Sequence, residues 1–292
     1  MKEMKGIIPP IITPFKEDGT IDEKLAAREI EYTIGAGVHG ISVGGSTGEG
    51  PTLRDEELQA LISIAREYTD SSQPVVCGVM RTCTRDAVRA GLAAKEAGAD
   101  AVMVTPTAYN VLVPDEEGMF DFYSTLSREV QLPIIIYNVI PQNTIRPGLF
   151  KRLIEETEYV RGIKQSVGSV PALYAMRMAC GDKGLVYAAT DDMLYTCYDS
   201  GADGAISAIL AVFPKLCVEM WDSFCAGDRV HAKELQDQMY DCWQSIAGNQ
   251  FPIRLKYALQ VLGRDPGLCR SPIVHLEEDE KRRIEKAFEK MG

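Results

Sequence analysis

Glu96-Ala-Gly-Ala-Asp-Ala-Val-Met-Val104 joins the end of a helical pattern to the start of an apolar strand pattern. The same join recurs as GAGVHGISV at residues 35–43 and as DSGADGAIS at residues 199–207. A glycine at this point fits the left-handed backbone conformation with which many helices end. The repeated join predicts that helices and strands alternate along the chain.

Short runs rich in Val and Ile recur eight times, at residues 6–13, 39–45, 74–80, 100–106, 132–138, 160–166, 184–190 and 203–209. Segments with helical spacing lie between several of them, at residues 22–37, 54–69, 84–99 and 115–130. Strands that alternate with helices form a parallel sheet. A doubly wound sheet usually has fewer strands, so we predict an α/β fold with a (β/α)8 TIM barrel over residues 1–226.

The rest of the chain carries helical patterns and no further strand pattern. Neither a low-complexity tract nor a linker rich in Pro and Ser separates this part from the barrel. We therefore expect residues 227–292 to form a C-terminal helical extension that packs on the barrel.

Composition and charge narrow the classes of partner. The 292-residue chain is 46% hydrophobic and 25% charged, which is typical of a globular protein, and its net charge is −11. An acidic chain without dense Lys/Arg clusters is a poor match for nucleic acid or an anionic membrane. There is neither a long apolar span nor a signal-peptide pattern, so we expect a cytoplasmic protein that acts on small molecules.

Cysteine and histidine spacing does not favour a metal site. The eight cysteines include no C-x-x-C pair, which disfavours zinc binding and a disulfide framework, and we expect most of them to be buried thiols. His39, His231 and His275 are widely dispersed in the sequence. We predict no metal centre.

Active sites of TIM barrels lie at the carboxyl ends of the strands, and one strand pattern there ends in Gly44-Gly-Ser-Thr-Gly48. Glycines allow tight turns that direct N–H groups inward, and the hydroxyls of Ser46 and Thr47 add donors suited to a carboxylate. The alternative is a plain strand-to-helix loop. The spacing of a P-loop is absent, which disfavours nucleotide binding.

Two further strand patterns carry candidate side chains. Tyr137 lies near the end of the run at residues 132–138, and Lys164 lies in the run at residues 160–166. Tyr137 is either a core tyrosine or a proton relay, and Lys164 taken alone would be a surface or snorkelling lysine. Near a tyrosine and an anion-binding loop, Lys164 becomes a candidate nucleophile that forms a Schiff base with a ketone. Asp191 and Asp192 are either acids at a helix N-terminus or ligands for a polyhydroxylated substrate, and together they would repel phosphate.

Several motifs occur together along the whole chain: PPIITPF (9–15), GGSTGEGPTL (44–53), YNV (137–139), GIKQS (162–166), GADGAIS (201–207) and K-x-A-L-x-x-x-G (256–263). With this set the chain resembles the pyruvate-dependent class I aldolase family, which includes dihydrodipicolinate synthase and N-acetylneuraminate lyase. The resemblance implies a lyase that uses no metal or organic cofactor, only a covalent imine with a keto acid.

The resemblance also implies roles for individual residues. Lys164 matches the Schiff-base lysine, Tyr137 the proton-shuttling tyrosine, and Tyr109 a tyrosine that reaches into a neighbouring subunit's site. The residues expected to bind substrate are Ser46, Thr47, Ser166, Asp191, Asp192 and Ile206, and Thr47 is also expected to take part in catalysis. Family members are commonly tetramers, so we expect a homo-oligomer arranged as a dimer of dimers.

The chain departs from the synthase pattern near the mouth of the barrel. It has Asn143 and no arginine where synthase members bind acidic groups, and Ala208 where the lyase branch has a serine. We therefore predict an aldolase or lyase similar to N-acetylneuraminate lyase, which splits or forms a carbon–carbon bond between pyruvate and an aldehyde. The alternatives are dihydrodipicolinate synthase, a dehydratase of 2-keto-3-deoxy sugar acids, and a non-catalytic barrel that binds keto acids.

Overall fold

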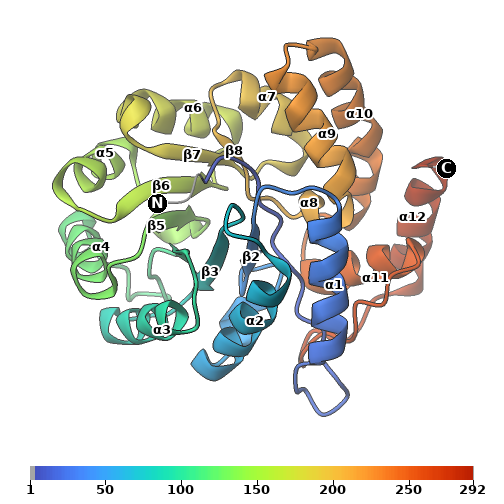
Figure 1. The fold of residues 1–292 in the computed structure, drawn as a ribbon, viewed down its shortest axis with the longest axis horizontal. Helices are drawn as coiled ribbons and strands as arrows, with labels where there is room; N and C mark the ends of the chain where they lie inside the picture. Colours follow the sequence, from blue (N-terminus) through green and yellow to red (C-terminus); the bar gives the residue numbers. More distant parts are fainter. Residues whose placement is uncertain (1–3, 292) are drawn as a thin grey trace.

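The computed structural model describes residues 4–291 and is a TIM barrel, as the sequence predicted. Eight parallel strands form one sheet in the order β1-β8-β7-β6-β5-β4-β3-β2 (Figure 1). Their bounds are β1 Gly6–Ile7, β2 Ile41–Val43, β3 Val75–Val79, β4 Ala101–Val104, β5 Ile134–Asn138, β6 Val160–Gln165, β7 Leu185–Ala188 and β8 Gly204–Ala205.

The ring closes between the first two strand segments. Pro10 pairs with Ser42 in a parallel bridge, and the Ile11 N–H donates to the Ser42 carbonyl at 2.7 Å. The regular part of β1 is shorter than the apolar run at residues 6–13 because Pro9 and Pro10 have no N–H to donate to a ladder. The sheet therefore returns to its own first segment.

Helices surround the ring of strands (Figure 1). Those that follow strands or complete the outer layer are α1 Glu23–Gly35, α2 Asp55–Tyr68, α3 Thr84–Glu96, α4 Glu116–Val130, α5 Pro147–Glu156, α6 Ser169–Cys180, α7 Leu194–Asp199, α8 Ile209–Val212 and α9 Pro214–Cys225. The remaining helices are α10 Arg229–Ile246, α11 Phe251–Val261 and α12 Glu278–Phe288.

Two apolar clusters fill the molecule, one on each side of the sheet. Ile134 and Ile136 face the helices, whereas Ile135 and Tyr137 point into the barrel with Ile206 and Tyr187. This alternation follows from the two-residue period of a strand. Every second position of β5 is thus available to the interior, where the chemistry can take place.

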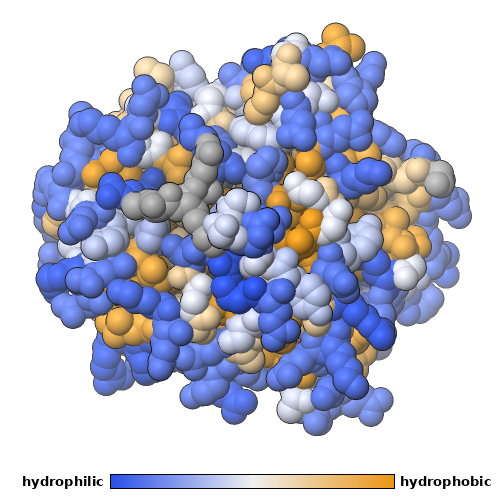
Figure 2. Space-filling view, viewed as in Figure 1, coloured by the Kyte–Doolittle hydropathy of each residue, from blue (hydrophilic) through white to orange (hydrophobic). Residues whose placement is uncertain are grey.

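The last helices lie against the barrel's outer layer rather than apart from it. α10 packs on α9 across the predicted boundary at residue 226, and Arg264, after α11, donates to the carbonyl of Ala211 in α8 at 2.9 Å. Figure 2 shows one face of the molecule covered mainly by hydrophilic side chains, with small apolar patches between them. Within residues 4–291, no helix has the length and apolarity needed to cross a membrane.

Candidate active site

Two neighbouring strands place Lys164 beside Tyr137. The backbone of β5 pairs with that of β6 so that Tyr137 is the direct partner of Lys164, and paired residues of parallel strands point to the same side. The Lys164 Nζ lies 3.9 Å from the centre of the Tyr137 ring. Both side chains are buried, at 5% exposure each. The tyrosine ring and the rest of the barrel interior thus shield this amine from bulk water.

The loop after β2 supplies a hydroxyl to this pair. The Tyr137 hydroxyl donates to Ser46 Oγ at 3.1 Å, and the adjacent Thr47 is buried. The loop turns at Gly44, whose φ of 66° lies in the left-handed region that favours glycine. A Cβ at Gly48 would lie 2.7 Å from the Ile11 carbonyl oxygen, so the loop packs closely on the first strand segment. The structure therefore brings Lys164, Tyr137 and Ser46 together, and the buried Thr47 follows Ser46 in the loop.

A polar cluster on the helix side supports the same two strands. The Asn138 side-chain amide donates to Gln165 Oε1 at 2.9 Å and to the Ile145 carbonyl at 3.0 Å. The backbone N–H of Ser166 donates to the Asn138 carbonyl at 3.1 Å, which extends the β5–β6 pairing past the end of the strand. Ser166 is half-buried at this point, directly after the strand that carries Lys164.

Asp191 and Asp192 make hydrogen bonds within the protein. Asp191 is buried and its Oδ1 accepts from the Ile209 N–H at 2.7 Å. Burial raises the Asp191 pKa to about 6, opposed by the nearby Ser207 hydroxyl, the Ile209 N–H and the positive charge of Lys164. Asp192 is half-buried and accepts from the Gln244 amide at 3.0 Å. Asp191 is thus a buried acid whose pKa is governed mainly by burial, with a smaller contribution from the charge of Lys164.

Tyr109 lies outside this group. Its side chain is 71% exposed, and it pairs with Leu112 in a short bridge within the loop after β4. Val111 and Leu112, in the same loop, are 84% and 68% exposed. Asn143 holds the base of this loop, because its side-chain amide donates to the Thr107 carbonyl at 2.8 Å.

The loop at residues 44–50 carries Ser46 and Thr47 and is called the hydroxyl loop. Two residues that the sequence did not single out support it. Glu49 and Lys256 form a buried ion pair with a distance of 2.7 Å. Both residues lie in motifs that are visible in the sequence, because Glu49 is part of GGSTGEG and Lys256 begins K-x-A-L-x-x-x-G. Nothing in the sequence alone says that the two side chains meet.

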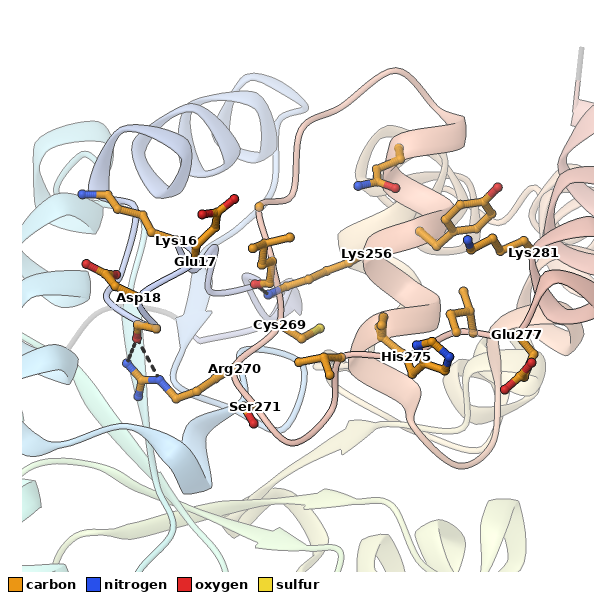
Figure 3. Close-up of a pocket in the computed structure, with 18 of the residues that line it drawn as sticks. Lys16, Glu17, Asp18, Lys256, Cys269, Arg270, Ser271, His275, Glu277 and Lys281 are labelled. Atoms are coloured by element: carbon orange, nitrogen blue, oxygen red, sulfur yellow. Dashed lines mark hydrogen bonds between the residues drawn. The ribbon is translucent and has the colours of Figure 1, made fainter.

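A cavity of about 1040 Å³ lies beyond this ion pair, between the segment at residues 16–19 and the C-terminal part of the chain. Figure 3 shows Lys256, Cys269 and Arg270 on its wall, with the Arg270 guanidinium donating to the Gly19 carbonyl. Neither Lys164 nor Tyr137 lines this cavity. It is therefore separate from the candidate active site.

The part of the chain that the structure describes contains no group of three or more His, Cys, Asp or Glu side chains placed to hold a metal ion. His39 accepts a hydrogen bond from the Ile7 N–H at 3.2 Å, whereas His231 pairs with Glu219. All eight cysteines are free thiols, and five of them are buried.

Comparison with known proteins shows which family this chain belongs to. The model of the dihydrodipicolinate synthetase family matches residues 3–291. The chain belongs to the dihydrodipicolinate synthetase family. A 4-hydroxy-tetrahydrodipicolinate synthase of Bartonella bacilliformis is 34% identical over 292 residues, which cover 99% of this chain and 98% of the relative. The members are pyruvate-dependent class I aldolases, so the chain is a lyase of this type, as the resemblance predicted.

Solved structures of the dihydrodipicolinate synthetase family have the same fold. The dihydrodipicolinate synthase of Acinetobacter baumannii, solved as a complex with pyruvate, has a TM-score of 0.92 and 31% identity, covering 99% of both chains. A monomeric dihydrodipicolinate synthase variant has a TM-score of 0.92 and 26% identity, covering 98% of this chain and 96% of the variant. Family members thus share this barrel over nearly their whole length.

Proposed function

We propose that the protein binds pyruvate as an imine on Lys164 and uses it to form or split a carbon–carbon bond with an aldehyde. The observation that carries this proposal is the contiguous set of Lys164, Tyr137 and Ser46, in which the amine lies 3.9 Å from the tyrosine ring centre and the tyrosine hydroxyl lies 3.1 Å from the serine oxygen. An amine, a proton relay and a hydroxyl for the carboxylate are the groups that imine chemistry on a 2-keto acid requires.

The steps follow from these groups. The Lys164 amine adds to the keto carbon, and loss of one water gives an iminium. The iminium withdraws electrons from the neighbouring carbon. That carbon loses a proton, and the iminium becomes an enamine. Tyr137 passes protons between the reacting atoms and Ser46, while Ser46 and Thr47 hold the carboxylate. The enamine adds to the aldehyde carbon, and hydrolysis of the new imine frees the amine; cleavage runs the same steps in reverse.

Trapping with borohydride tests the imine. Wild-type protein incubated with pyruvate and reduced should gain one pyruvyl adduct, located on Lys164 by peptide mass spectrometry. Lys164→Ala should show no adduct at this site and lose turnover by roughly a thousandfold or more. Lys183→Ala, at an exposed lysine, is the matched control and should retain both. A folded wild-type protein without an adduct would refute the proposal.

The substrate that condenses with pyruvate or is split to release it has two candidates. Relatives that are 30–34% identical over nearly the whole chain are named 4-hydroxy-tetrahydrodipicolinate synthase, which supports condensation with aspartate semialdehyde. This support is stronger than that for a substrate like N-acetylneuraminate. A specific observation still favours a hydroxylated 2-keto acid, because Asn143 donates to a backbone carbonyl where synthase members are expected to have a cationic side chain for acidic groups.

A paired assay separates these candidates. The protein is supplied with pyruvate and aspartate semialdehyde in one reaction, and with a series of hydroxylated 2-keto acids in the other, while pyruvate consumed or released is measured. Consumption of pyruvate only with aspartate semialdehyde supports the synthase. Release of pyruvate from the hydroxylated acids supports the lyase. Loss of water without release of pyruvate would identify a dehydratase.

We also propose that a second copy of the chain covers the loop at residues 109–113. This loop exposes Tyr109, Val111 and Leu112, and apolar side chains that lie together on a surface are typical of an interface. Tyr109 would then complete the partner's site. Leu112→Asp should convert the assembly to smaller species in sedimentation and lower activity, whereas unchanged sedimentation would refute the proposal.

A further inference from the structure

The backbone of the loop that carries Ser46 and Thr47 is strained where it turns at Glu49. Glu49 has a φ of 56°, in the left-handed region that non-glycine residues rarely adopt. Its N–H donates to the Ser46 carbonyl at 3.1 Å and closes a turn over the two hydroxyl residues. Any change in the position of Glu49 is therefore passed directly to Ser46 and Thr47. Residues held in this conformation require strong support from their surroundings.

That support comes from the Glu49 carboxylate. One oxygen accepts from Lys256 Nζ at 2.7 Å, and the other accepts from the Arg270 N–H at 2.9 Å. The side chains of Glu49 and Lys256 are 2% and 3% exposed. A buried carboxylate with a charged donor on one oxygen and a backbone donor on the other is held in a single position.

Lys256 directs all of its donors toward this junction. Besides Glu49, its ammonium donates to the Thr13 carbonyl at 2.7 Å and to the Leu268 carbonyl at 2.6 Å. A lysine ammonium has three donors, so none is left over. Thr13 in turn donates through Oγ1 to the Gly48 carbonyl at 2.7 Å. The loop is thus fixed at two consecutive residues, Gly48 and Glu49, by groups that lie under it.

We propose that Glu49 and Lys256 are positioning residues that set the orientation of Ser46 and Thr47 toward the keto-acid carboxylate and Tyr137. This inference rests on the proposed imine chemistry at Lys164. Neither residue contacts the reacting atoms. The pair acts through the loop backbone, so its loss affects how well pyruvate is held more than it affects the amine itself.

The test separates positioning from a purely structural role by a matched control. Glu49→Gln keeps the shape and removes the charge, and Glu49→Gln combined with Lys256→Met removes both charges, so that no unpaired buried ion remains. The control is Glu29→Gln in the buried pair of Glu29 with Arg264, which joins α1 to the segment after α11 and does not involve residues 44–50. Each variant is titrated with pyruvate under borohydride, and adduct on Lys164 is measured beside thermal unfolding.

We expect the half-saturating pyruvate concentration to rise about tenfold or more in Glu49→Gln and in the double variant, because loss of one well-placed hydrogen bond to a charged group has about this effect. Glu29→Gln should lower the unfolding temperature while its folded protein keeps the wild-type half-saturation. If the two residues act by positioning, the double variant should regain unfolding temperature relative to Glu49→Gln, while its half-saturating pyruvate concentration stays high.

The outcomes distinguish two failures. If the wild-type protein forms no adduct, the proposed imine chemistry is wrong and this inference falls with it. If the wild type forms the adduct and the folded double variant has the same half-saturation, only the positioning role is refuted. An equal rise in half-saturation in Glu29→Gln would also refute it, because any buried ion pair would then have the same effect.

Discussion

Replacing Asp191 with asparagine should make the protein more stable at neutral pH, although it removes an acid whose charge interacts with that of Lys164. Burial raises the Asp191 pKa from 3.8 to about 6, so the folded state holds this proton more tightly than the unfolded state. The stability associated with the protonated acid is present below the unfolded pKa and is lost as pH rises through about 6. At pH 7.5, where the acid is ionised in both states, the raised pKa lowers the free energy of unfolding by about 3 kcal/mol relative to a side chain that stays uncharged. The Asp191→Asn variant would carry no such dependence, because an amide does not titrate in this range.

The measurement compares the wild type with Asp191→Asn by urea unfolding at pH 5 and pH 7.5, at one protein concentration. The other carboxylates contribute equally to both proteins and cancel. We expect the stability of the variant relative to the wild type to increase by about 1.4 kcal/mol between the two pH values. A difference between the proteins that does not change with pH, or that changes in the opposite direction, would show that Asp191 is ionised in the fold as easily as in water.

Three further substitutions test other contacts. Tyr137→Phe should lower kcat by about a hundredfold or more, because the proton relay and the hydrogen bond to Ser46 are lost, while thermal unfolding changes little; a wild-type kcat would exclude the relay. Gly48→Ala should raise KM for pyruvate in steady-state assays, since the added Cβ meets the Ile11 carbonyl, and an unchanged KM would show that the loop adapts. Arg264→Met should cost about 3–5 kcal/mol in denaturant unfolding by leaving Glu29 buried and unpaired, and a loss below about 1 kcal/mol would contradict this reasoning.

Much of the barrel could be predicted from local patterns. Each strand run ends near a glycine or a polar cluster, and the order of parallel strands makes Tyr137 and Lys164 neighbours once β5 and β6 are recognised. The site at the strand ends follows from the barrel itself. The grouping of amine, tyrosine and hydroxyl loop was therefore accessible from the sequence together with the family resemblance.

What escaped prediction depends on contacts between distant parts of the chain. Asp191 and Asp192 read alike in the sequence, yet one is buried against α8 and the other bonds to Gln244 in α10. The partner of Glu49 lies 207 residues further along the chain. No periodicity reports such a pairing, because it is decided by how the C-terminal helices pack on the barrel.

The ion pair of Glu49 with Lys256 has a consequence for synthesis of the protein on the ribosome. The hydroxyl loop, Tyr137 and Lys164 all emerge before Lys256, since chains are made from the N-terminus and their early segments begin to fold first. The barrel strands can pair at that stage, but the loop lacks its anchor until α11 has been made. In a nascent chain the loop that carries Ser46 and Thr47 thus gains the contact of Glu49 with Lys256 only after nearly nine tenths of the chain has been made.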